Sequence, residues 1–377
     1  MRHAAAYSGP ERACDGIVLR PPLAYHWSFG ARENPAARWV VVDDDVFWPG
    51  RDELVCLGSS GEMKWNSPGD FGSGLIVEPD GIACVVSAAF AQARGEGDRY
   101  FARVSRTDGS VIRRQTIRGF LQLISSDAVV FHEEVAASSG VKVRLVGYGA
   151  TDSGIEQRWM IEMDGADRRD RFSLAATSDQ TKGYMGWGSG AIASIDLRDG
   201  SLVWKADVSD LGGKLVLDAH LESTKGVCVV ATKAWTGAFD AKTGKRLWSS
   251  AIWGARVVYG DRVYVVQDDT FYAFDLFDGA IKFRCDVRSE MEQKGKRKFD
   301  RISTHIAASD THIWGGDPYG TLWAFNRETG RPEWHHRPKD ATGYSGGVPA
   351  ISGNRLYIPS FSMDPRFPPS LYCYEQA

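Results

Sequence analysis

The stretch Thr321–Trp334, TLWAFNRETGRPEW, contains the unit from which most of this chain is built. An apolar run ends at Asn326, a short polar turn closes on Gly330, and an aromatic ring follows at Trp334. This order predicts a β-hairpin, because glycine adopts the positive φ of a tight turn and the flanking runs suit buried strands.

Other segments repeat this pattern in the same register. In the four clear copies, Asp or Asn precedes the turn glycine by four positions and Trp or Phe follows it by four. Upstream, Arg113 takes the aromatic position of one weaker copy and Trp159 comes one residue late in another, so we expect these two units to be the least regular. Besides the first, the clear copies are 191–204 (AIASIDLRDGSLVW), 237–248 (GAFDAKTGKRLW) and 271–283 (FYAFDLFDGAIKF), and the weaker ones are 54–65, 100–113 and 143–159.

The spacing of the turn glycines indicates the architecture. They stand at positions 61, 109, 154, 200, 244, 279 and 330, so successive turns are 35 to 51 residues apart. A period in the forties built from hairpins is typical of β-propellers, in which each repeat is one blade. The ring that opens each return strand should then lie between blades, and replacing Trp248 or Trp334 by Ala should cost about 3–5 kcal/mol.

The two chain ends together supply one more unit. Leu371–Glu375 (LYCYE) resembles the strand before a turn, and Ala24–Phe29 (AYHWSF) resembles the strand after one, with Trp27 in the aromatic position. Pairing them would remove two open sheet edges. The sequence therefore predicts an all-β fold, an eight-bladed β-propeller of four-stranded antiparallel blades closed by its N- and C-terminal strands. Residues 1–22 are expected to form a loosely ordered leader and residues 23–377 a single domain.

The pattern apolar-Asp-x-x-x-Gly-x-x-x-Trp, clearest in GAFDAKTGKRLW and GTLWAFNRETGRPEW, resembles the pyrroloquinoline-quinone-like (PQQ-like) propeller repeat. The resemblance extends from about Trp27 to the end of the chain and is strongest between Ala191 and Trp334. That family includes quinone-dependent alcohol dehydrogenases and the propeller lipoprotein of bacterial outer-membrane protein assembly. The chain resembles the non-catalytic assembly-type propellers more closely than the dehydrogenases.

Charge and composition exclude several classes of partner. Lys and Arg (45) nearly balance Asp and Glu (48), so no overall field favours nucleic acid or an anionic membrane. No apolar stretch approaches the roughly 18 residues of a membrane span, and the first twenty residues lack the apolar core of a secretion signal. We therefore expect a cytoplasmic protein that is monomeric by itself and binds neither membranes nor nucleic acid.

The six cysteines are too far apart in the sequence for a C-x-x-C metal or redox motif. No two are closer than 28 residues, which excludes C-x-x-C spacing. Cys56, Cys84, Cys228 and Cys373 fall inside apolar strand runs, where a small buried thiol is expected.

Candidate catalytic residues are few. The string 343–347 fits G-x-S-x-G, but a strand pattern follows it where the hydrolase motif needs a helix. The glycine run 183–190 is better interpreted as a strand and turn than as a dinucleotide fingerprint. His220 and His305 are expected on innermost strands, where with Asp218 they could hold a metal or act as acid and base, but histidines on core strands more often only form hydrogen bonds. We assign no catalytic, cofactor-binding or metal-binding residue and expect no cofactor.

An enzyme with a metal or quinone site at the mouth of a central channel is the alternative. The resemblance implies, for a quinone dehydrogenase, a cofactor on a tryptophan floor, commonly against two adjacent bonded cysteines, with calcium or a lanthanide beside a catalytic carboxylate. This chain has no adjacent cysteine pair. Whether the protein is an enzyme is left open, and a non-enzymatic role is favoured.

The favoured function is a protein-binding scaffold, such as an inhibitor or immunity-type protein. Three connections, 88–98, 287–301 and 361–370, are longer than the fold requires, and 164–171 is a charged run. By the predicted strand order these segments emerge on one face, and interfaces favour Arg, Met and aromatic residues. The predicted partner-binding residues are Phe90, Arg94, Arg168, Arg169, Arg171, Lys294, Arg297, Phe361, Met363, Arg366 and Phe367.

Overall fold

The structure is a computed structural model of the 377-residue chain. The chain divides into two compact units, which are described separately: unit one is 1–9, 35–57 and 63–249, and unit two is 10–34, 58–62 and 250–377. The structure describes residues 3–4, 17–31, 39–50, 53–69, 71, 75–78, 81–87, 99–117, 120–124, 128–137, 140–151, 154–162, 173–176, 181–187, 190–212, 220–232, 234–289, 302, 305–338, 349–360 and 369–376.

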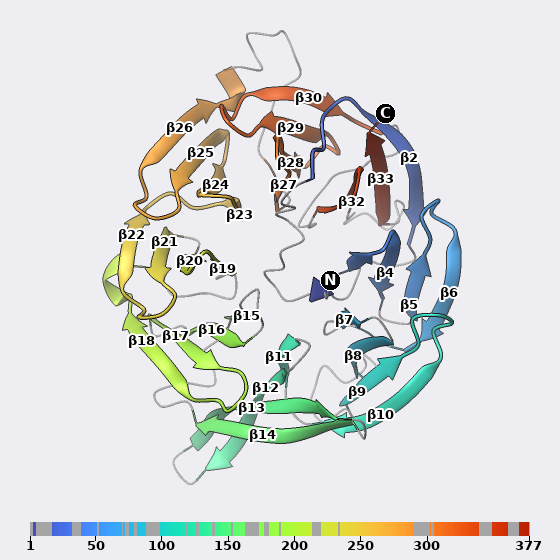
Figure 1. Cartoon of the computed structure of the whole chain (residues 1–377), viewed down its shortest axis with the longest axis vertical. Coiled ribbons are helices and arrows are strands. Elements are labelled where there is room, and N and C mark those ends of the chain that lie inside the picture. Colours follow the sequence, from blue (N-terminus) through green and yellow to red (C-terminus); the bar gives the residue numbers. More distant parts are fainter. Residues whose placement is uncertain are drawn as a thin grey trace. The chain divides into compact units, whose positions relative to one another are not determined.

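The described residues of unit one form five antiparallel sheets, numbered in chain order (Figure 1). Consecutive strands are neighbours within each sheet, and β1 adds a strand beside β7. Sheet 1 contains β3 (Val40–Val42), β4 (Asp45–Pro49), β5 (Glu53–Leu57) and β6 (Met63–Pro68); sheet 2 contains β1 (His3–Ala4), β7 (Leu75–Glu78), β8 (Gly81–Ser87), β9 (Arg99–Val104) and β10 (Val111–Ile117). Sheet 3 contains β11 (Phe120–Ile124), β12 (Val129–Ala137), β13 (Gly140–Thr151) and β14 (Gly154–Glu162); sheet 4 contains β15 (Ser173–Ala176), β16 (Lys182–Trp187), β17 (Ala191–Asp196) and β18 (Leu202–Asp207). The 3-10 helix η3 (Ser209–Leu211) precedes sheet 5, which contains β19 (His220–Thr224), β20 (Val227–Ala231), β21 (Thr236–Asp240) and β22 (Arg246–Ser250).

The described residues of unit two form three antiparallel sheets of four strands each. Sheet 6 contains β23 (Ala255–Tyr259), β24 (Arg262–Gln267), β25 (Thr270–Asp275) and β26 (Ile281–Asp286). Sheet 7 contains β27 (Ala307–Ala308), β28 (His312–Gly316), β29 (Leu322–Asn326) and β30 (Pro332–His336). Sheet 8 contains β31 (Ala350–Ser352), β32 (Arg355–Ser360), β33 (Ser370–Gln376) and β2 (Leu23–Gly30).

The all-β prediction is confirmed. Within the described ranges, the helical parts are η3 and a single turn at 287–289. None of the described helices has the length and apolar character that crossing a membrane requires.

The two ends of the chain share sheet 8, as predicted. β2 pairs antiparallel with β33 from Leu23–Gln376 to Gly30–Ser370, and the blue and dark red strands lie side by side in Figure 1. Of the predicted leader, residues 3–4 form β1, and residues 17–22 pack within unit two. Leu19 is fully buried in a cluster with Trp314 and Leu322. The boundary between residues 22 and 23 stays a prediction.

Hydrophobic clusters lie between consecutive sheets within each unit. Sheets 4 and 5 share a cluster that includes Trp204 and Val230. In unit two, Phe271 of sheet 6 stacks on Phe325 of sheet 7 with ring centroids 5.3 Å apart. A strand between two such clusters is buried on both faces: in β28, Ile313 belongs to the cluster shared with sheet 6 and Trp314 to the cluster shared with sheet 8, and all five residues are buried. This arrangement explains why the middle strands consist of nearly continuous apolar runs.

The last hairpin of most repeats carries a β-bulge directly before its aromatic residue. The ladder skips Lys64 before Trp65, Val203 before Trp204 and Glu333 before Trp334. A bulge leaves one residue without a partner across the ladder and turns the strand. The ring is thereby directed inward while the skipped residue projects from the outermost strand.

Several of the aromatic residues at this position cover a turn glycine of another hairpin. Trp204 Nε1 donates a hydrogen bond to the Ala241 carbonyl at 2.9 Å, and a methyl group at Gly244 would lie 2.5 Å from the Trp204 ring. Glycine is required there for a second reason, since its φ is +73°. The same contact recurs between Trp159 and Gly200, Trp65 and Gly109, Trp27 and Gly61, and Phe283 and Gly330. In the four pairs other than Trp27 and Gly61, the ring lies between hairpin units that follow each other along the chain, as expected.

The Asp or Asn four positions before the glycine caps the turn. Asp240 accepts hydrogen bonds from the amides of Lys242 and Thr243 at 3.1 and 2.7 Å. The side chain of Arg198 and its amide bind Asp196 in the same way, and the guanidinium hydrogen bond is the main reason that the pKa of Asp196 is lowered to about 2. These contacts satisfy turn amides that strand pairing leaves open.

Sheets 2 and 3 depart from the pattern, as the sequence suggested. Arg113 occupies the aromatic position opposite Arg103, and Gln115, two residues later, contacts the last hairpin of sheet 3. Its Nε2 donates to the Ile155 carbonyl at 2.7 Å, and its Oε1 accepts from the Ile155 amide at 2.8 Å. Gly154 begins β14 opposite Thr151, so its assignment as a turn glycine is corrected.

Candidate protein-binding face

The long connections predicted to bind a partner have the positions in strand order that the sequence indicated. The span 88–98 joins β8 to β9, and 361–368 joins β32 to β33, which are second-to-third connections. The spans 163–172 and 290–301 follow β14 and β26, the fourth strands of their sheets. In an antiparallel sheet the second and fourth strands run in the same direction, so they finish at the same end of the sheet. In each sheet these connections therefore leave from the end opposite the turn of the last hairpin.

Backbone pairing holds the bases of two of these connections. Ser87 pairs with Arg99 at one base, and Ser360 pairs with Ser370 at another. The Ala31 amide also donates to the Pro369 carbonyl at 2.8 Å. Each of the two connections thus begins and ends on adjacent, hydrogen-bonded strands.

The base of the connection after β26 is held by polar contacts and by burial. Asp286 accepts hydrogen bonds from the amide and hydroxyl of Ser289 at 3.0 and 2.8 Å, and these contacts hold the pKa of its carboxyl below the usual value. Val287 is fully buried, and its amide donates to the Asp269 carbonyl. The Arg288 guanidinium pairs with the Asp269 carboxylate at 3.1 Å. The chain therefore leaves sheet 6 in a defined direction.

The connection after β14 leaves beside an ion pair. Glu162, the last residue of β14, lies opposite Arg144 of β13. The Arg144 guanidinium binds the Glu133 carboxylate at 2.9 Å, and the Glu133 side chain is only 12% exposed. This ion pair links β12 to β13 beside Glu162, and the charged run 164–171 follows Glu162 in the sequence.

All eleven predicted partner-binding residues lie outside the described residues. They fall in the spans 88–98, 163–172, 290–301 and 361–368. The structure therefore gives the frame around these positions, and their role in binding stays a prediction.

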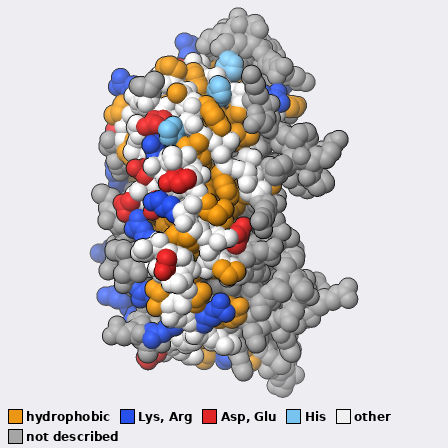
Figure 2. Space-filling model, turned by 90° about the vertical axis from the view of Figure 1, so that its right-hand side faces the viewer, with side chains coloured by type: hydrophobic (Ala, Val, Ile, Leu, Met, Phe, Trp, Pro, Cys, Tyr) orange, Lys and Arg blue, Asp and Glu red, His pale blue; other side chains and the backbone are white. Residues whose placement is uncertain are grey.

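The described surface carries mixed charge. On the face shown in Figure 2, Lys and Arg side chains are interspersed with Asp and Glu, and hydrophobic side chains lie among them. Several of the charges are paired, for example Lys64 with Asp45 and Arg246 with Asp210. Mixed, paired charge does not produce the broad field of one sign that a polyanion would require.

The positions weighed for catalysis give no converging site in the part of the chain that is described. His220 begins β19 and His305 is half-buried and has interaction partners, whereas Asp218 and the span 343–347 lie outside the described residues. Among described residues, no group of three His, Cys, Asp or Glu side chains is placed to hold a metal. The glycine run beginning at Gly183 is the predicted strand and turn, β16 pairing with β17.

The cysteines behave as predicted where their side chains are described. Cys56, Cys228 and Cys373 are buried thiols, and Cys285 is a fourth. Burial raises the pKa of the Cys228 thiol, so it stays protonated and unreactive. The side chain of Cys84 lies outside the described set.

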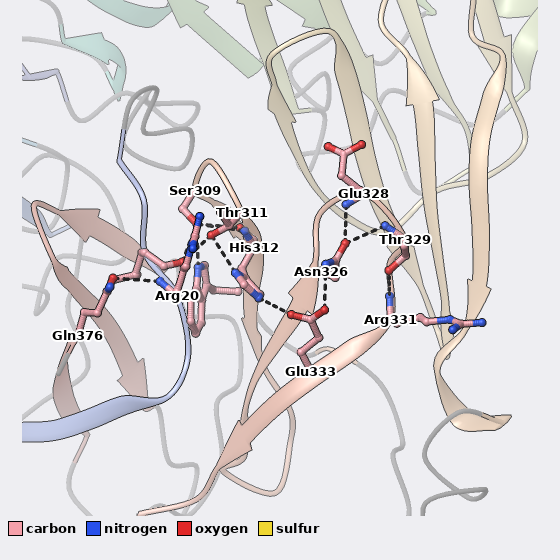
Figure 3. A network of polar contacts seen from close by, with 12 residues as sticks. Arg20, Ser309, Thr311, His312, Asn326, Glu328, Thr329, Arg331, Glu333 and Gln376 are labelled. Carbon is pink, nitrogen blue, oxygen red and sulfur yellow. Dashed lines mark hydrogen bonds and ion pairs between the residues drawn. The ribbon is translucent and has the colours of Figure 1, made fainter.

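Sequence reasoning missed a polar network in sheet 7, shown in Figure 3. The His312 ring, with its side chain 7% exposed, contacts the Thr311 hydroxyl through Nδ1 at 2.9 Å and the Glu333 carboxylate through Nε2 at 2.8 Å. Asn326 joins the network by donating Nδ2 to Glu333 at 2.9 Å. The sequence signal that could have revealed this network is Glu333. It directly precedes the aromatic residue Trp334, at the position that the bulge turns outward.

Comparisons with known proteins agree with this geometry. A family model described as outer membrane protein assembly factor BamB matches residues 232–364. The outer membrane protein assembly factor BamB of Burkholderia pseudomallei (strain K96243) is 28% identical over 188 residues, which are 48% of this chain and 45% of that protein. This match thus spans less than half of the relative's length. BamB from Moraxella catarrhalis superposes with a TM-score of 0.65 at 14% identity, covering 94% of this chain and 100% of that one. Quinohemoprotein alcohol dehydrogenase from Comamonas testosteroni superposes with a TM-score of 0.65 at 12% identity, covering 94% of this chain and 76% of that one.

Residues 232–364 therefore match a family of PQQ-like repeats, and the chain shares the fold of solved propeller proteins. The resemblance inferred from the hairpin motif is confirmed, and the matched residues 232–364 overlap the region where the motif is strongest. The prediction of a cytoplasmic location is wrong, because the related protein is named an outer membrane protein assembly factor. The prediction rested on a missing secretion signal, and such an absence does not establish a compartment.

Proposed function

We propose that this PQQ-like propeller is a non-enzymatic scaffold that binds a protein partner in outer-membrane protein assembly. The observation that supports it most is the match of residues 232–364 to the assembly-factor family. An inhibitory or immunity role would be a narrower form of the same scaffold function. The monomeric state and the lack of nucleic-acid and membrane binding stay predictions.

We further propose that the eight sheets are the blades of one closed propeller and that residues 23–377 form one domain. Consecutive sheets within each unit share apolar clusters, as blades do. Trp27 of sheet 8 donates to the Ser59 carbonyl at 2.8 Å and covers Gly61, just as Trp204 covers Gly244. The contact that links one repeat to the next thus continues from the last repeat to the first.

The proposed binding face consists of the four long connections. They leave from the end of each sheet opposite the last hairpin turn. The described residues at which they begin or end are fixed by strand pairing and by ion pairs. A rigid base limits the conformational entropy that a loop loses when it binds. The basic run Arg168, Arg169 and Arg171 supplies the side chains that interfaces favour most.

A charge-reversal variant tests this face. The triple variant Arg168→Glu, Arg169→Glu, Arg171→Glu should lose most of its native partner in affinity capture from solubilised membranes, because three positive charges of the patch become negative. The matched control is Lys205→Glu, Lys242→Glu, Lys245→Glu, which reverses three exposed charges on β18 and the last hairpin of sheet 5. Equal recovery with both variants would contradict the proposed face.

The second candidate is an enzyme with a quinone or metal site at the channel mouth. The likeness to a quinohemoprotein alcohol dehydrogenase supports keeping it, although at 12% identity that likeness concerns the fold alone. Elemental analysis and a visible absorption spectrum, taken before and after incubation with pyrroloquinoline quinone and Ca²⁺, separate the two candidates. The scaffold proposal predicts no stoichiometric metal and no retained chromophore.

A further inference from the structure

A segment before β2 is held on sheet 7 by a small number of hydrogen bonds. We call residues 17–22 the N-terminal strap. The Leu19 carbonyl accepts from the Thr311 hydroxyl at 2.9 Å and from the Ser309 hydroxyl at 3.3 Å. The Ile17 carbonyl accepts from the Asp310 amide at 2.9 Å. All three donors belong to the turn between β27 and β28.

The Thr311 hydroxyl also touches the buried imidazole of His312. Its Oγ lies 2.9 Å from His312 Nδ1, while His312 Nε2 lies 2.8 Å from Glu333 Oε2 (Figure 3). The ring lies near Trp314, with centroids 5.7 Å apart. Because the side chain of His312 is 7% exposed, water has little room to replace either partner.

A count of protons shows that these contacts depend on one another. The Thr311 hydroxyl has a single proton, and at 2.9 Å it donates that proton to Leu19. Its oxygen is then an acceptor for His312 Nδ1–H. The Glu333 carboxylate can only accept, so it requires Nε2–H as well. The complete network therefore needs both ring nitrogens protonated, which is the imidazolium form.

Loss of one proton changes the direction of a hydrogen bond. A neutral imidazole keeps Nε2–H for the Glu333 carboxylate, because a bare Nε2 would face negative charge at 2.8 Å. Nδ1 then becomes an acceptor and takes the Thr311 proton. The Leu19 carbonyl is left with the longer contact to Ser309 at 3.3 Å, whose proton can also go to the His312 carbonyl at 3.2 Å.

We propose that protonation of His312 controls how tightly the N-terminal strap is held, through a relay from Glu333 to His312 to Thr311 to Leu19. The strap is held more tightly when His312 is an imidazolium than when the ring is neutral.

Other ionisable groups lie on the elements packed around His312. Asp310 in the same turn accepts a hydrogen bond from the Tyr259 hydroxyl, and the Arg327 guanidinium lies over the Tyr259 ring at 4.8 Å. Glu328 pairs with Arg262 at 2.7 Å, and the strap contributes Arg20, whose amide donates to Gln376. Glu333 is the carboxylate that contacts the ring directly.

Hydrogen exchange and ring NMR test this proposal on the full-length protein. The ¹⁵N shifts of His312 should change, as the pH is raised, from two protonated nitrogens to the Nε2–H tautomer. Over that same transition, protection factors of the Arg20 and Asp310 amides, corrected for the intrinsic pH dependence of exchange, should fall roughly three- to tenfold, the factor that one neutral hydrogen bond contributes.

Two variants keep the test decisive. In Glu333→Gln the amide oxygen still accepts from neutral Nε2–H but no longer stabilises the imidazolium, so the transition should occur at lower pH. Glu328→Gln removes a nearby carboxylate that pairs with Arg262 and should leave the transition unchanged. Constant protection of Arg20 and Asp310 while His312 titrates, or a single neutral tautomer at every pH, would overturn the proposal.

Discussion

The contact between sheets 4 and 5 and the contact between sheets 2 and 3 both join the last strand of one sheet to a hairpin of the next, but with different chemistry. Trp204 places a buried ring over Gly244 and one hydrogen bond on Ala241. Gln115 places no ring there and makes two hydrogen bonds to the backbone of Ile155. The repeat therefore requires a side chain on the last strand that binds the next hairpin, and an aromatic ring is one way to supply it. The two contacts should differ in energy, because ring burial stabilises more than a neutral amide pair.

The largest expected effect comes from removing the ring. Trp204→Ala should lower the free energy of unfolding by about 3–5 kcal/mol, because it leaves a cavity over Gly244 and frees the Ala241 carbonyl. Urea unfolding followed by circular dichroism measures this. A loss below about 1 kcal/mol would mean that the ring does not hold the two sheets together.

Adding a methyl group under the Trp204 ring should destabilise the fold somewhat less than removing the ring. Gly244→Ala should destabilise by about 2–4 kcal/mol, since the methyl group meets Trp204 and the backbone has positive φ. Gly226→Ala in the same sheet is the matched control, because Gly226 has φ of +75° and an added methyl group there would meet nothing within 4 Å. The control should lose only about 1–2 kcal/mol. Equal losses in thermal and urea unfolding would show that the ring contact adds nothing.

The glutamine contact should be weaker than the tryptophan contact. Gln115→Ala should cost about 1–3 kcal/mol, because it leaves the Ile155 amide and carbonyl without their partners. Gln115→Glu should cost at least as much, since a carboxylate cannot donate to the Ile155 carbonyl. Unfolding free energies that show a larger loss for Gln115→Ala than for Trp204→Ala would reverse the expected order.

The smallest effect concerns the turn cap beside Trp204. Because the pKa of Asp196 is lowered to about 2 in the folded protein, its contribution is present above the unfolded pKa of about 4 and is lost as pH falls toward 2. Stability should drop by roughly 1–2 kcal/mol in that window, and Asp196→Asn should remove this part of the pH dependence. The same slope in both proteins would assign the acid sensitivity to other carboxylates.

Much of this architecture could be predicted from sequence because it depends on local spacing. The Asp-x-x-x-Gly turn and the following Trp specify one hairpin, and the halves at Trp27 and Cys373 specify the shared sheet. The role of Gln115 could not be predicted, because it depends on which backbone atoms a neighbouring sheet places opposite its amide. The His312 network was missed for a similar reason, since the strap that completes it comes from Leu19, far away along the chain.

The partner-binding face shows the limit of such reasoning. Its residues were chosen by type and by connection order, and strand order confirms the connection types. Whether Phe361 or Arg168 contacts a partner depends on loop conformation, which hairpin spacing does not determine. The cytoplasmic prediction rested on the missing secretion signal, and the similarity to an outer membrane assembly factor corrects it.

The proposed closure of the repeats requires the ring contact to continue across the chain ends, from Trp27 to Gly61. The most direct test is the NMR spectrum of Gly61 in the wild-type protein and in Trp27→Leu. Trp27 stacked on the glycine should shift the Gly61 Hα resonances strongly upfield through its ring current, and the variant should return them toward ordinary values. Gly61 resonances that are unshifted in the wild type, and unchanged by the substitution, would contradict this closure.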